Sequence, residues 1–343
     1  MIISIPKETT PQETRIAITP TYVTKFIEQG YTIKIEHNAG LLSGFSDKEY
    51  QQAGAIICHS PQETYQNSDI ILKIWSPLSN ELKFLQPSQN VICNCQNIKT
   101  LSELQKLSST NINLFALNLI PRISKAQNMD ILSSQDNLSG YEAVIIGAGH
   151  SLSSLPLMIT SAGTLAPLKV LVIGIGVAGL QAIATAKRLG AIVYAHDIRP
   201  ETEEQTSSLG AIFIKEISPE LLNSIKLVIT SAQSEGKTAP IVLNSQQLQY
   251  LPPKCVIIDM ASDNGGNIPQ QNVPEDLIII RNSHLNRYIP YSASSLFAGN
   301  VYNFCNYLFP NKKLTIDIQD EIISRTLICH NNQAYHPYLN GEN

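Results

Sequence analysis

The chain is low in charge, and this excludes one broad class of partner. Charged residues make up 15% of the 343 residues, and the formal net charge is −4. Nucleic-acid-binding proteins usually concentrate Lys and Arg on one face, whereas here these residues are scattered, so we expect no nucleic-acid partner. Hydrophobic residues make up 43%, which is typical of a globular protein long enough for two domains.

The cysteines and histidines do not have the spacing of a disulfide framework or a metal site. Cys93 and Cys95 are one residue apart, which fits neither the C-x-x-C redox motif nor half of a zinc site. We therefore predict reduced thiols and no metal. His150 is interpreted as a satisfied polar residue. The other histidines considered, expected at the surface or as caps, are His37, His59, His196, His330 and His336.

No segment is predicted to cross a membrane or to direct secretion. The opening MIISIPKETT lacks the basic-then-apolar order of a signal peptide. The stretch from Leu165 to Ala186 is apolar enough to suggest a membrane span, but it contains Pro167, Lys169 and three glycines. The expected location is therefore the reducing cytoplasm.

Short β-branched runs alternate with amphipathic segments over the first 120 residues, which predicts a parallel, doubly wound sheet. Thr19 and Ser46 are candidate N-caps, and Gly30 and Gly54 are candidate helix ends. The expected strands are Ile2–Ile5, Thr32–Glu36, Ala55–Cys58, Ile70–Ile74, Val91–Cys95 and Asn113–Ala116. The expected helices are Pro20–Gln29, Asp47–Ala53, Pro61–Asn67 and Leu101–Leu107.

A second α/β series begins near residue 168 and predicts a domain of Rossmann type. Residues 122–139 lack Gly and Pro and are predicted to form a connecting helix. The run Leu314–Ile318 is predicted to be a strand in a tail that packs on the first domain. The expected elements of the second series are Lys169–Ile173, helix 178–189, Ile192–Ala195, Ala211–Ile214, Leu227–Thr230, Val256–Asp259 and Leu277–Ile280.

The predicted fold is therefore α/β, with two doubly wound parallel-sheet domains and a cleft between them. Residues 1–135 together with 308–343 are expected to form the first domain. Residues 136–307 are expected to form the second, nucleotide-binding domain.

The segment from Gly174 to Gly179 has a G-x-G-x-x-G pattern between an apolar strand and a helix, and this context predicts a dinucleotide site. Gly174 permits the tight turn, Gly176 lets the backbone approach a pyrophosphate, and Gly179 lets the helix pack on the strand. The helix N-terminus, with Val177 and Ala178, would face the phosphates with its unpaired N–H groups. The alternative is a glycine-rich turn without a nucleotide.

Asp197 lies about 20 residues beyond the first glycine, where an acidic residue accepts the ribose hydroxyls of NAD. A carboxylate there would repel the 2′-phosphate of NADP, so NAD(H) is the expected cofactor. Arg199 lies two residues further on, so the discrimination of this site between NAD(H) and NADP(H) is expected to be incomplete. Ile198 belongs to the same run and is assigned to the cofactor site with its two neighbours.

Polar residues recur at mostly three- and four-residue intervals along the predicted connecting helix. On periodicity alone we favour a solvated face. The stripe is rich in amides and hydroxyls, however, and could instead hydrogen-bond a nicotinamide ribose and carboxamide. Its members are Arg122, Gln127, Asp130, Ser133, Ser134, Asn137 and Tyr141.

These segments resemble the NAD(H)-binding subunit of proton-translocating nicotinamide nucleotide transhydrogenases. The resemblance rests on Pro121–Tyr141, Val177–Gly190 and Asp197–Arg199, and it extends from residue 1 to about residue 340. The opening Ile5–Glu8 and the run Arg15–Pro20 are also similar to the related alanine dehydrogenases.

The resemblance implies a homodimer whose bound NADH gives hydride to NADP+ held on a partner subunit. Proton passage through membrane subunits would be coupled to this transfer. The chain would then lie at the inner face of the cytoplasmic membrane, held by its partners without inserting. By motif match, Arg122, Gln127, Asp130 and Ser133 are implied as nicotinamide-end residues, with Tyr141 as a neighbour.

An alanine dehydrogenase is the first alternative. Those enzymes have a catalytic lysine where this chain has Trp75, and a histidine where it has Gln96. Arg15 is kept and Asp263 matches a dehydrogenase aspartate, but a lone arginine cannot move protons for an imino acid. Hydride exchange between two nicotinamides needs no base at the reaction centre, so these losses favour the transhydrogenase interpretation.

A second alternative is a degenerate NAD(H)-binding protein without turnover, because the chain departs from the family pattern. Ile146 and Gly149 replace acidic and aromatic residues after the connector, and His284-Leu-Asn286 replaces an Asn-x-Pro turn. The segment between Ile214 and Leu227 is short. Ser218 and Pro219 are predicted to begin one short helix there, in place of the family's mobile flap.

Overall fold

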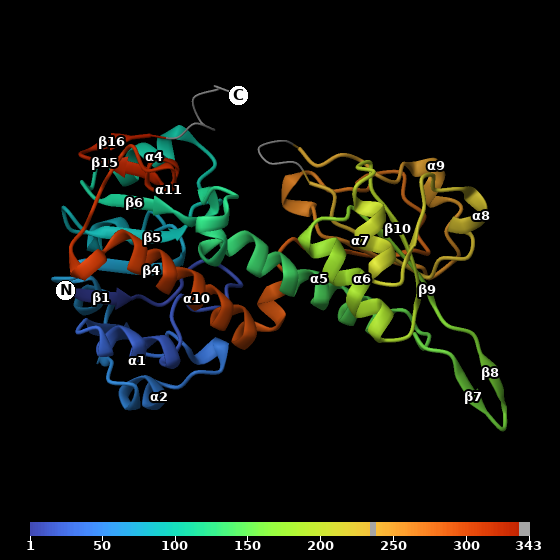
Figure 1. Cartoon of the computed structure of the whole chain (residues 1–343), viewed down its shortest axis with the longest axis horizontal. Helices are drawn as coiled ribbons and strands as arrows, with labels where there is room; N and C mark the ends of the chain where they lie inside the picture. Colours follow the sequence, from blue (N-terminus) through green and yellow to red (C-terminus); the bar gives the residue numbers. More distant parts are fainter. Residues whose placement is uncertain (234–237, 336–343) are drawn as a thin grey trace. The chain divides into compact units, whose positions relative to one another are not determined.

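The computed structural model describes residues 1–233 and 238–335, so His336 lies outside the described residues. Internal contacts divide the chain into unit 1, Met1–Gln135 with Arg287–Asn343, and unit 2, Asp136–Asn286 (Figure 1). The second boundary differs from the expected residue 307. The cause is helix α10 (Pro290–Leu308), whose buried side chains, including Phe297 and Phe304, pack in the core of unit 1.

Unit 1 is built on an eight-stranded sheet with the order β16-β15-β6-β5-β4-β1-β2-β3. Strands β1 to β6 are parallel to their neighbours, whereas β15 pairs antiparallel with β6 and β16 antiparallel with β15. The strands are β1 (Ile2–Ile5), β2 (Thr32–Glu36), β3 (Ile56–Cys58), β4 (Ile70–Trp75), β5 (Asn90–Asn94), β6 (Asn113–Ala116), β15 (Leu327–His330) and β16 (Gln333–Ala334). The six predicted strands are confirmed within a residue or so.

The helices of unit 1 begin and end close to the predicted residues. Ser46 caps α2 through a capping box with Glu49, as expected of an N-cap. Gly30 and Gly54 follow α1 and α2 with positive φ, which glycine adopts without strain. Thr19 precedes Pro20 as predicted, but its side chain makes no capping hydrogen bond. The helices are α1 (Pro20–Glu28), α2 (Asp47–Gln52), α3 (Pro61–Tyr65), α4 (Leu101–Ser108), α10 and α11 (Glu321–Thr326).

The described part of the C-terminal tail, residues 313–335, packs on unit 1 as predicted, but the predicted strand was wrong. No strand forms at Leu314–Ile318, where the side chain of Ile318 is 68% exposed. The edge of the sheet beside β6 is taken instead by β15, whose Ile328 and Cys329 are buried. Burial of this later apolar run outweighs the β-branched pattern of the earlier one.

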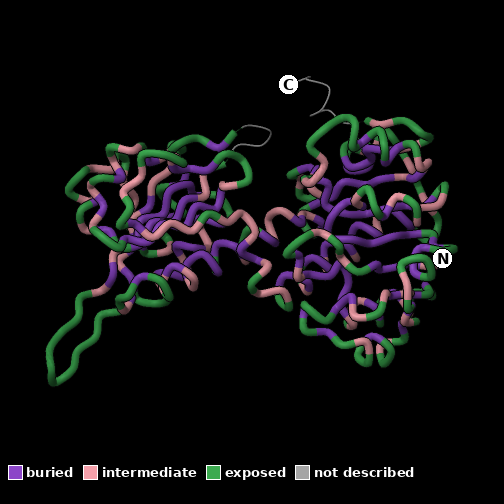
Figure 2. Tube along the Cα trace, turned by 180° about the vertical axis from the view of Figure 1, so that it is seen from behind, coloured by how far each residue is buried: buried purple, intermediate pink, exposed green. Residues whose placement is uncertain are grey.

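Unit 2 is built on a six-stranded, fully parallel sheet with the order β11-β10-β9-β12-β13-β14. Figure 2 shows these strands buried in the interior. The order reverses between β9 and β12, and open α/β sheets bind ligands beyond the carboxyl ends of the strands at such a point. The strands are β9 (Lys169–Ile173), β10 (Ile192–His196), β11 (Ile212–Phe213), β12 (Leu227–Thr230), β13 (Val256–Asp259) and β14 (Ile278–Arg281).

The helices of unit 2 include the predicted one after the glycine motif and a short one in the shortened segment. Ser218 caps α8 by accepting from the Leu221 backbone N–H, which confirms the predicted short helix. The helices are α6 (Val177–Arg188), α7 (Thr202–Ser208), α8 (Pro219–Leu222) and α9 (Ser245–Leu248). Within the described residues, the 3-10 helices apart from one in the connector are η1 (Leu41–Ser43), η2 (Leu82–Phe84), η3 (Leu117–Leu119), η5 (Ser262–Asn264), η6 (Leu285–Tyr288) and η7 (Pro310–Lys312).

The connector is not the single helix predicted over residues 122–139. It consists of a 3-10 helix, η4 (Ser124–Met129), and an α-helix, α5 (Ile131–His150). Asp130 separates them with an extended backbone and accepts from the Ser133 backbone N–H at 3.0 Å, the contact of an N-cap residue. The polar stripe is therefore no continuous helix face, because Arg122, Gln127 and Asp130 precede α5.

Glycine does not end α5, although the prediction stopped before Gly140. A Cβ at Gly140 would lie 2.1 Å from the backbone oxygen of Ala178 on α6. The glycine is therefore required by the close approach of α5 and α6 within unit 2.

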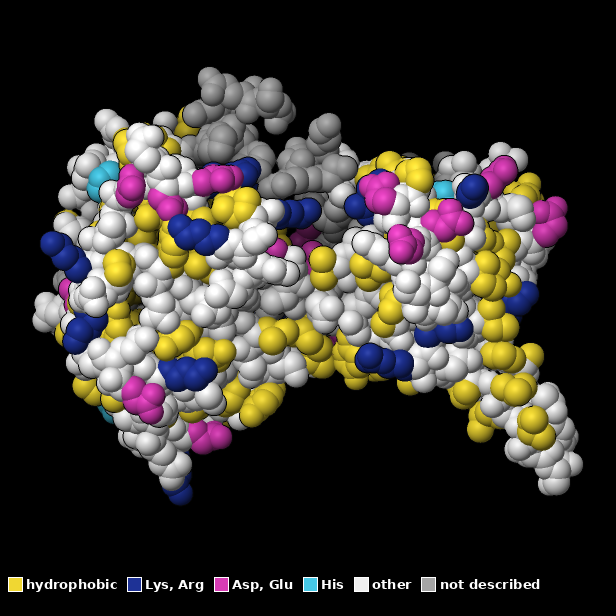
Figure 3. Space-filling model, viewed as in Figure 1, with side chains coloured by type: hydrophobic (Ala, Val, Ile, Leu, Met, Phe, Trp, Pro, Cys, Tyr) yellow, Lys and Arg dark blue, Asp and Glu magenta, His cyan; other side chains and the backbone are white. Residues whose placement is uncertain are grey.

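A β-hairpin that the sequence pattern did not predict projects from unit 2 (Figure 1). It is formed by β7 (Met158–Thr160) and β8 (Gly163–Leu165), and all six strand residues are exposed. Leu157, Ile159 and Leu165 are among its exposed apolar side chains, which Figure 3 shows in yellow.

Membrane-spanning helices and metal clusters are both absent from the described residues. In residues 1–233 and 238–335, no helix is long and apolar enough to cross a membrane. Over the same ranges, no three His, Cys, Asp or Glu side chains are grouped so that they could hold a metal ion.

Candidate functional site

The loop between β9 and α6 is shaped by its glycines. Gly174 has φ +92°, and a Cβ there would lie 2.6 Å from the Ala232 backbone nitrogen. A Cβ at Gly179 would lie 1.9 Å from the Gly174 oxygen, so the helix packs against the strand end only because this residue is glycine. Both positions therefore have the geometry that the motif predicts.

The N-terminus of α6 is open to a ligand. Gly176 is the N-cap residue, no side chain caps the helix, and a Cβ at Gly176 would meet no atom within 4 Å. Val177 is 40% exposed, whereas Ala178 is buried. The first backbone N–H groups of a helix lack intrahelical partners and attract anions, so this loop has the geometry of a pyrophosphate site.

Asp197 follows β10 and lies next to this loop. Its Oδ2 accepts from the Ile175 backbone N–H at 2.6 Å, and Arg199 donates to both carboxylate oxygens at 2.9 Å. Arg199 also donates to the Ile175 backbone oxygen at 3.0 Å. Burial opposes ionisation of Asp197, but these hydrogen bonds outweigh it and lower the pKa to about 2. Ile198, between them, is 92% exposed.

Asn267, a buried residue that the sequence analysis did not assign to the site, supports the loop between β9 and α6. Asn267 accepts from the Ala232 backbone N–H at 3.0 Å and donates to the Ala232 oxygen at 2.7 Å. Its own backbone N–H donates to Asp259 at the end of β13. The amide thus joins the loops after β12 and β13 beside Gly174. The only sequence signal was its place after the glycine pair at 265 and 266.

The four predicted nicotinamide-end residues belong to unit 1, where two of them contact each other and the other two are exposed. Asp130 and Ser133 are brought together, because the Ser133 hydroxyl donates to Asp130 Oδ2 at 2.6 Å. Arg122 and Gln127 are exposed, Gln127 within η4. Ser133 lies in the first turn of α5, so Asp130 fixes the start of that helix as well as its hydroxyl.

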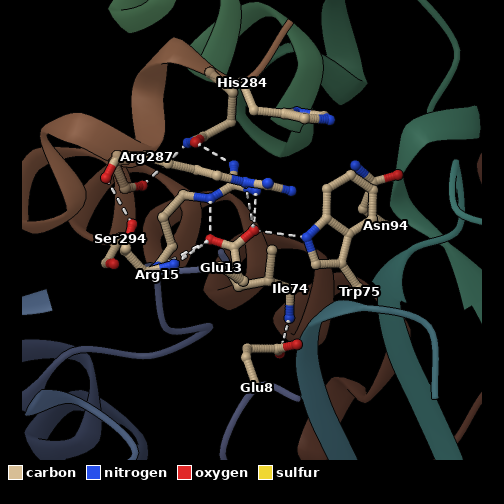
Figure 4. Close-up of polar contacts among 12 residues, drawn as sticks. Glu8, Glu13, Arg15, Ile74, Trp75, Asn94, His284, Arg287 and Ser294 are labelled. Carbon is tan, nitrogen blue, oxygen red and sulfur yellow. Dashed lines mark hydrogen bonds and ion pairs between the residues drawn. The ribbon is translucent and has the colours of Figure 1, made fainter. Parts of the chain in front are cut away.

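A buried ionic cluster lies in unit 1, where Trp75 and two guanidinium groups converge on Glu13 (Figure 4). Arg15 donates to both Glu13 oxygens at 2.8 Å and to Gln135 at 2.8 Å. The Trp75 indole N–H donates to Glu13 at 2.6 Å, and Arg287 Nε lies 3.2 Å from the same carboxylate. Burial opposes ionisation of Glu13, but Arg15 and Arg287 together lower its pKa to about 2.

A second buried cluster lies in unit 1 around Lys73, which is 1% exposed. Its Nζ donates to Glu81 at 2.9 Å and lies 3.4 Å from Glu8. The other Glu8 oxygen accepts from the Ile74 backbone N–H at 2.6 Å. Burial raises the pKa of Glu8 to about 7, against the attraction of Lys73. Both carboxylates are thus held by this lysine, so Lys73 is committed to an internal ion pair.

Residues of both clusters lie at the strand-order reversal of unit 1. In unit 1 the strand order reverses between β1 and β4, and Glu8 and Trp75 lie at or just beyond the carboxyl ends of these strands. Ligands of open α/β sheets bind at such a point. Here the Trp75 indole donates to Glu13, Lys73 is paired with Glu8 and Glu81, and Arg15 is paired with Glu13.

The two remaining dehydrogenase-like positions lie apart in the chain and make local contacts. Gln96 is exposed, and its backbone N–H donates to Asn94 at 2.9 Å. In unit 2, His284 Nε2 lies 2.7 Å from Asp263 Oδ2. His284, which stands in place of the expected Asn-x-Pro turn, is therefore within hydrogen-bonding distance of Asp263.

Comparison with known proteins gives matches over nearly the whole chain. The N-terminal domain described as alanine dehydrogenase/PNT matches residues 4–139, and the C-terminal domain of the same description matches residues 143–337. The chain is 35% identical to the first part of NAD(P) transhydrogenase subunit alpha of Rhodospirillum rubrum, with all of both chains covered. It is 37% identical to the protein of that name in Rickettsia prowazekii, covering 94% of this chain and 93% of the relative.

A solved structure has the same fold. The transhydrogenase from Sinorhizobium meliloti superimposes with a TM-score of 0.91 at 36% identity. The match covers 98% of this chain and 99% of that one.

Proposed function

The chain belongs to the alanine dehydrogenase/PNT family, and we propose that it is the NAD(H)-binding subunit of a proton-translocating transhydrogenase. In this role it passes hydride between NADH and NADP+ held on a partner subunit. The observation that carries the proposal is the contrast between the two strand-order reversals. The loop of unit 2 is open at Gly176, whereas at the reversal of unit 1 Arg15 and Trp75 are both hydrogen-bonded to Glu13.

Unit 2 would hold the adenosine and pyrophosphate of NAD(H). The pyrophosphate would accept hydrogen bonds from the N-terminus of α6, at Val177, Ala178 and Gly179. Asp197 would accept the ribose hydroxyls, which requires Arg199 to release part of its hold on the carboxylate. Released in this way, Arg199 would remain beside the ribose.

Arg122, Gln127, Asp130 and Ser133 would act at the nicotinamide end. Hydride passes directly between two rings, so catalysis consists of holding the rings in contact and excluding water. The amide of Gln127 and the guanidinium of Arg122 are exposed, and the carboxylate of Asp130 is paired with the Ser133 hydroxyl. Such groups can orient the carboxamide and ribose of a nicotinamide without supplying a base. NADP(H) would be held by the partner, because this chain offers one G-x-G-x-x-G loop.

An amino-acid dehydrogenase is the less favoured alternative, because its substrate carboxylate and imino group would need partners that are already engaged. Arg15 is bound to Glu13 and Gln135, and Trp75 donates to Glu13. Lys73 is enclosed by two carboxylates. The degenerate, non-catalytic NAD(H)-binding protein is the other alternative, and the departures from the family pattern support it.

The proposed assembly is a homodimer docked on an NADP(H)-binding domain and on membrane subunits at the inner face of the cytoplasmic membrane. The exposed apolar hairpin supports the homodimer, since Ile159 is 73% exposed and Leu165 is 59% exposed. Sedimentation of the purified chain as a monomer at micromolar concentration would contradict the dimer.

The cofactor preference follows from Asp197. NADH should bind more tightly than NADPH by about 2–4 kcal/mol, roughly 30- to 700-fold, because the 2′-phosphate meets a buried carboxylate and leaves it without its ribose partner. Fluorescence titration of the purified chain measures both affinities. Asp197→Asn should narrow the gap, and equal affinities in the unmodified chain would overturn the assignment.

The engaged side chains around Glu13 in unit 1 predict the absence of amino-acid dehydrogenase activity. With NAD+ and alanine, the chain should produce no NADH at neutral or alkaline pH, because the groups beside Arg15 are engaged in internal ion pairs and hydrogen bonds. NADH absorbance monitors the reaction. Turnover that increases with alanine concentration would favour the dehydrogenase alternative.

The direct test of the proposed function is reconstitution. The purified chain is mixed with an NADP+-loaded transhydrogenase partner domain, and NADPH formation from NADH is followed. Formation that requires both components supports the proposal. Tight NADH binding without any transfer would favour the degenerate alternative.

A further inference from the structure

We propose that one polar face of α10 positions the nicotinamide-end segment of unit 1, and this inference rests on the proposed function. The face consists of Asn300, Asn303 and Tyr307, and we call these three residues the α10 clamp. They act through η4 and Asp130, so they are positioning residues for hydride transfer. The sequence similarity that marks Gln127 and Asp130 gives no role to α10.

The first contact of the clamp is made by two amides on one carbonyl. Asn300 Nδ2 donates to the Asn128 backbone oxygen at 2.9 Å, and Asn303 Nδ2 donates to the same oxygen at 3.1 Å. Two donors from a rigid helix therefore fix the peptide plane between Asn128 and Met129, which lies between Gln127 and Asp130 in the chain.

Asn300 also reaches the start of α5. Its Oδ1 accepts from the Ser134 hydroxyl at 2.7 Å, and its side chain is buried. Ser134 follows Ser133, whose hydroxyl is held by Asp130. One buried amide thus bridges the two segments on either side of Asp130.

The second contact of the clamp is made by a tyrosine with two charged partners. Lys125 Nζ donates to the Tyr307 hydroxyl at 2.7 Å, and that hydroxyl donates to Asp320, the N-cap residue of α11. Lys125 also lies 3.5 Å from Asp320. The N-terminal part of η4 is thereby tied to α10 and α11, so the clamp holds η4 at both ends.

The segment needs such external support. A 3-10 helix of six residues is longer than usual, and its internal hydrogen bonds have poor geometry. Ala126 and Met129 anchor it in the core, but Arg122 and Gln127 are on the exposed side. The clamp residues are spaced by three and four along α10, so they lie on one side of the helix.

The test compares clamp variants with matched controls on the same helix, in the full chain. Asn300→Ala/Asn303→Ala and Tyr307→Phe remove the clamp contacts. Asn306→Ala and Tyr302→Phe are the controls, because Tyr302 accepts from Gln29, beyond the end of α1, rather than from η4. Asn300→Asp keeps the acceptor for Ser134 but loses the donor to Asn128.

Three quantities are measured for each variant. These are the rate of hydride transfer to the NADP+-loaded partner domain, the NADH dissociation constant, and amide hydrogen exchange of residues 124–130 without partner. We expect transfer to fall by about 10- to 100-fold in the double variant, because a shift of about 1 Å in reacting groups has that effect. NADH affinity should change less than about twofold, because adenosine and pyrophosphate dominate binding.

Exchange at 124–130 should be faster in the clamp variants and unchanged in the controls. Asn300→Asp should fall between the wild type and the double variant, because Asn303 still donates to the Asn128 oxygen. Asn303→Gln, which keeps a donor, should retain more of the rate than Asn303→Ala. Wild-type transfer in the double variant, or equal losses of rate and NADH affinity, would overturn the clamp. An inactive wild-type chain would instead contradict the proposed function, and the exchange measurement would still test whether α10 holds η4.

Discussion

Gln127→Leu and Asp130→Leu will each slow hydride transfer by about 100-fold in the reconstituted complex, while the NADH dissociation constant changes by less than about threefold. The reason is that different parts of the proposed site orient the nicotinamide and bind the rest of NADH. The nicotinamide end must be oriented for transfer, whereas affinity comes mainly from the α6 N-terminus and Asp197 in unit 2.

Controls separate orientation from folding. Asp130 also accepts from the Ser133 backbone N–H, so its loss removes a helix cap and about 1 kcal/mol of stability. Asp130→Asn keeps that acceptor, so it should fold like the wild type and still transfer hydride slowly. Gln105→Leu, an exposed amide on α4, should leave both parameters unchanged. Rate and affinity that fall together would make these residues general binding elements.

Lys73→Met will lower the free energy of unfolding by about 3–5 kcal/mol, because it leaves buried carboxylates without their cation. Lys73 is 1% exposed and holds Glu81 directly and Glu8 at 3.4 Å. Denaturant unfolding followed by circular dichroism measures the loss. Adding Glu8→Gln to Lys73→Met should recover part of it, and a loss below about 1 kcal/mol would contradict the buried ion pair.

The pH dependence of stability separates Glu8 from Glu13. Burial raises the pKa of Glu8 to about 7, so the folded state holds its proton more tightly than the unfolded state. This group therefore lowers stability as pH rises from about 4.5 to 7, by at most about 3 kcal/mol, and Glu8→Gln should remove the trend. The pKa of Glu13 is about 2, so its stabilisation is present above about pH 4.5 and is lost toward pH 2.

The regular elements could be predicted from the sequence because each has a local cause. Buried parallel strands such as Lys169–Ile173 and Val256–Asp259 are continuous apolar runs, and they were predicted to the residue. The tight turn at Gly174 and the close packing at Gly179 were also predicted, because both depend on the backbone within a few residues. Ser46 and Ser218 act as the predicted caps for the same reason.

The features that could not be predicted depend on partners distant in the chain. The connector was predicted as one helix because nothing local breaks residues 122–139, whereas Asp130 is held extended between η4 and α5. Asn267, Asn300 and Asn303 bind backbone groups of segments distant in the chain, and no periodicity in the sequence marks such contacts. The strand at 327–330 displaced the predicted one because the free edge of β6 is a tertiary feature.

The central claim is that this chain gives hydride directly from its bound NADH to NADP+ on a partner. The most direct measurement is single-turnover mixing of the chain, loaded with NADH deuterated at the transferred C4 position, with the NADP+-loaded partner domain in ordinary aqueous buffer. Mass spectrometry of the product then measures the label. We predict that the NADPH carries one deuterium, and that the yield depends on Gln127 and Asp130. Unlabelled NADPH, or no NADPH despite saturation of the chain with NADH, would contradict the account.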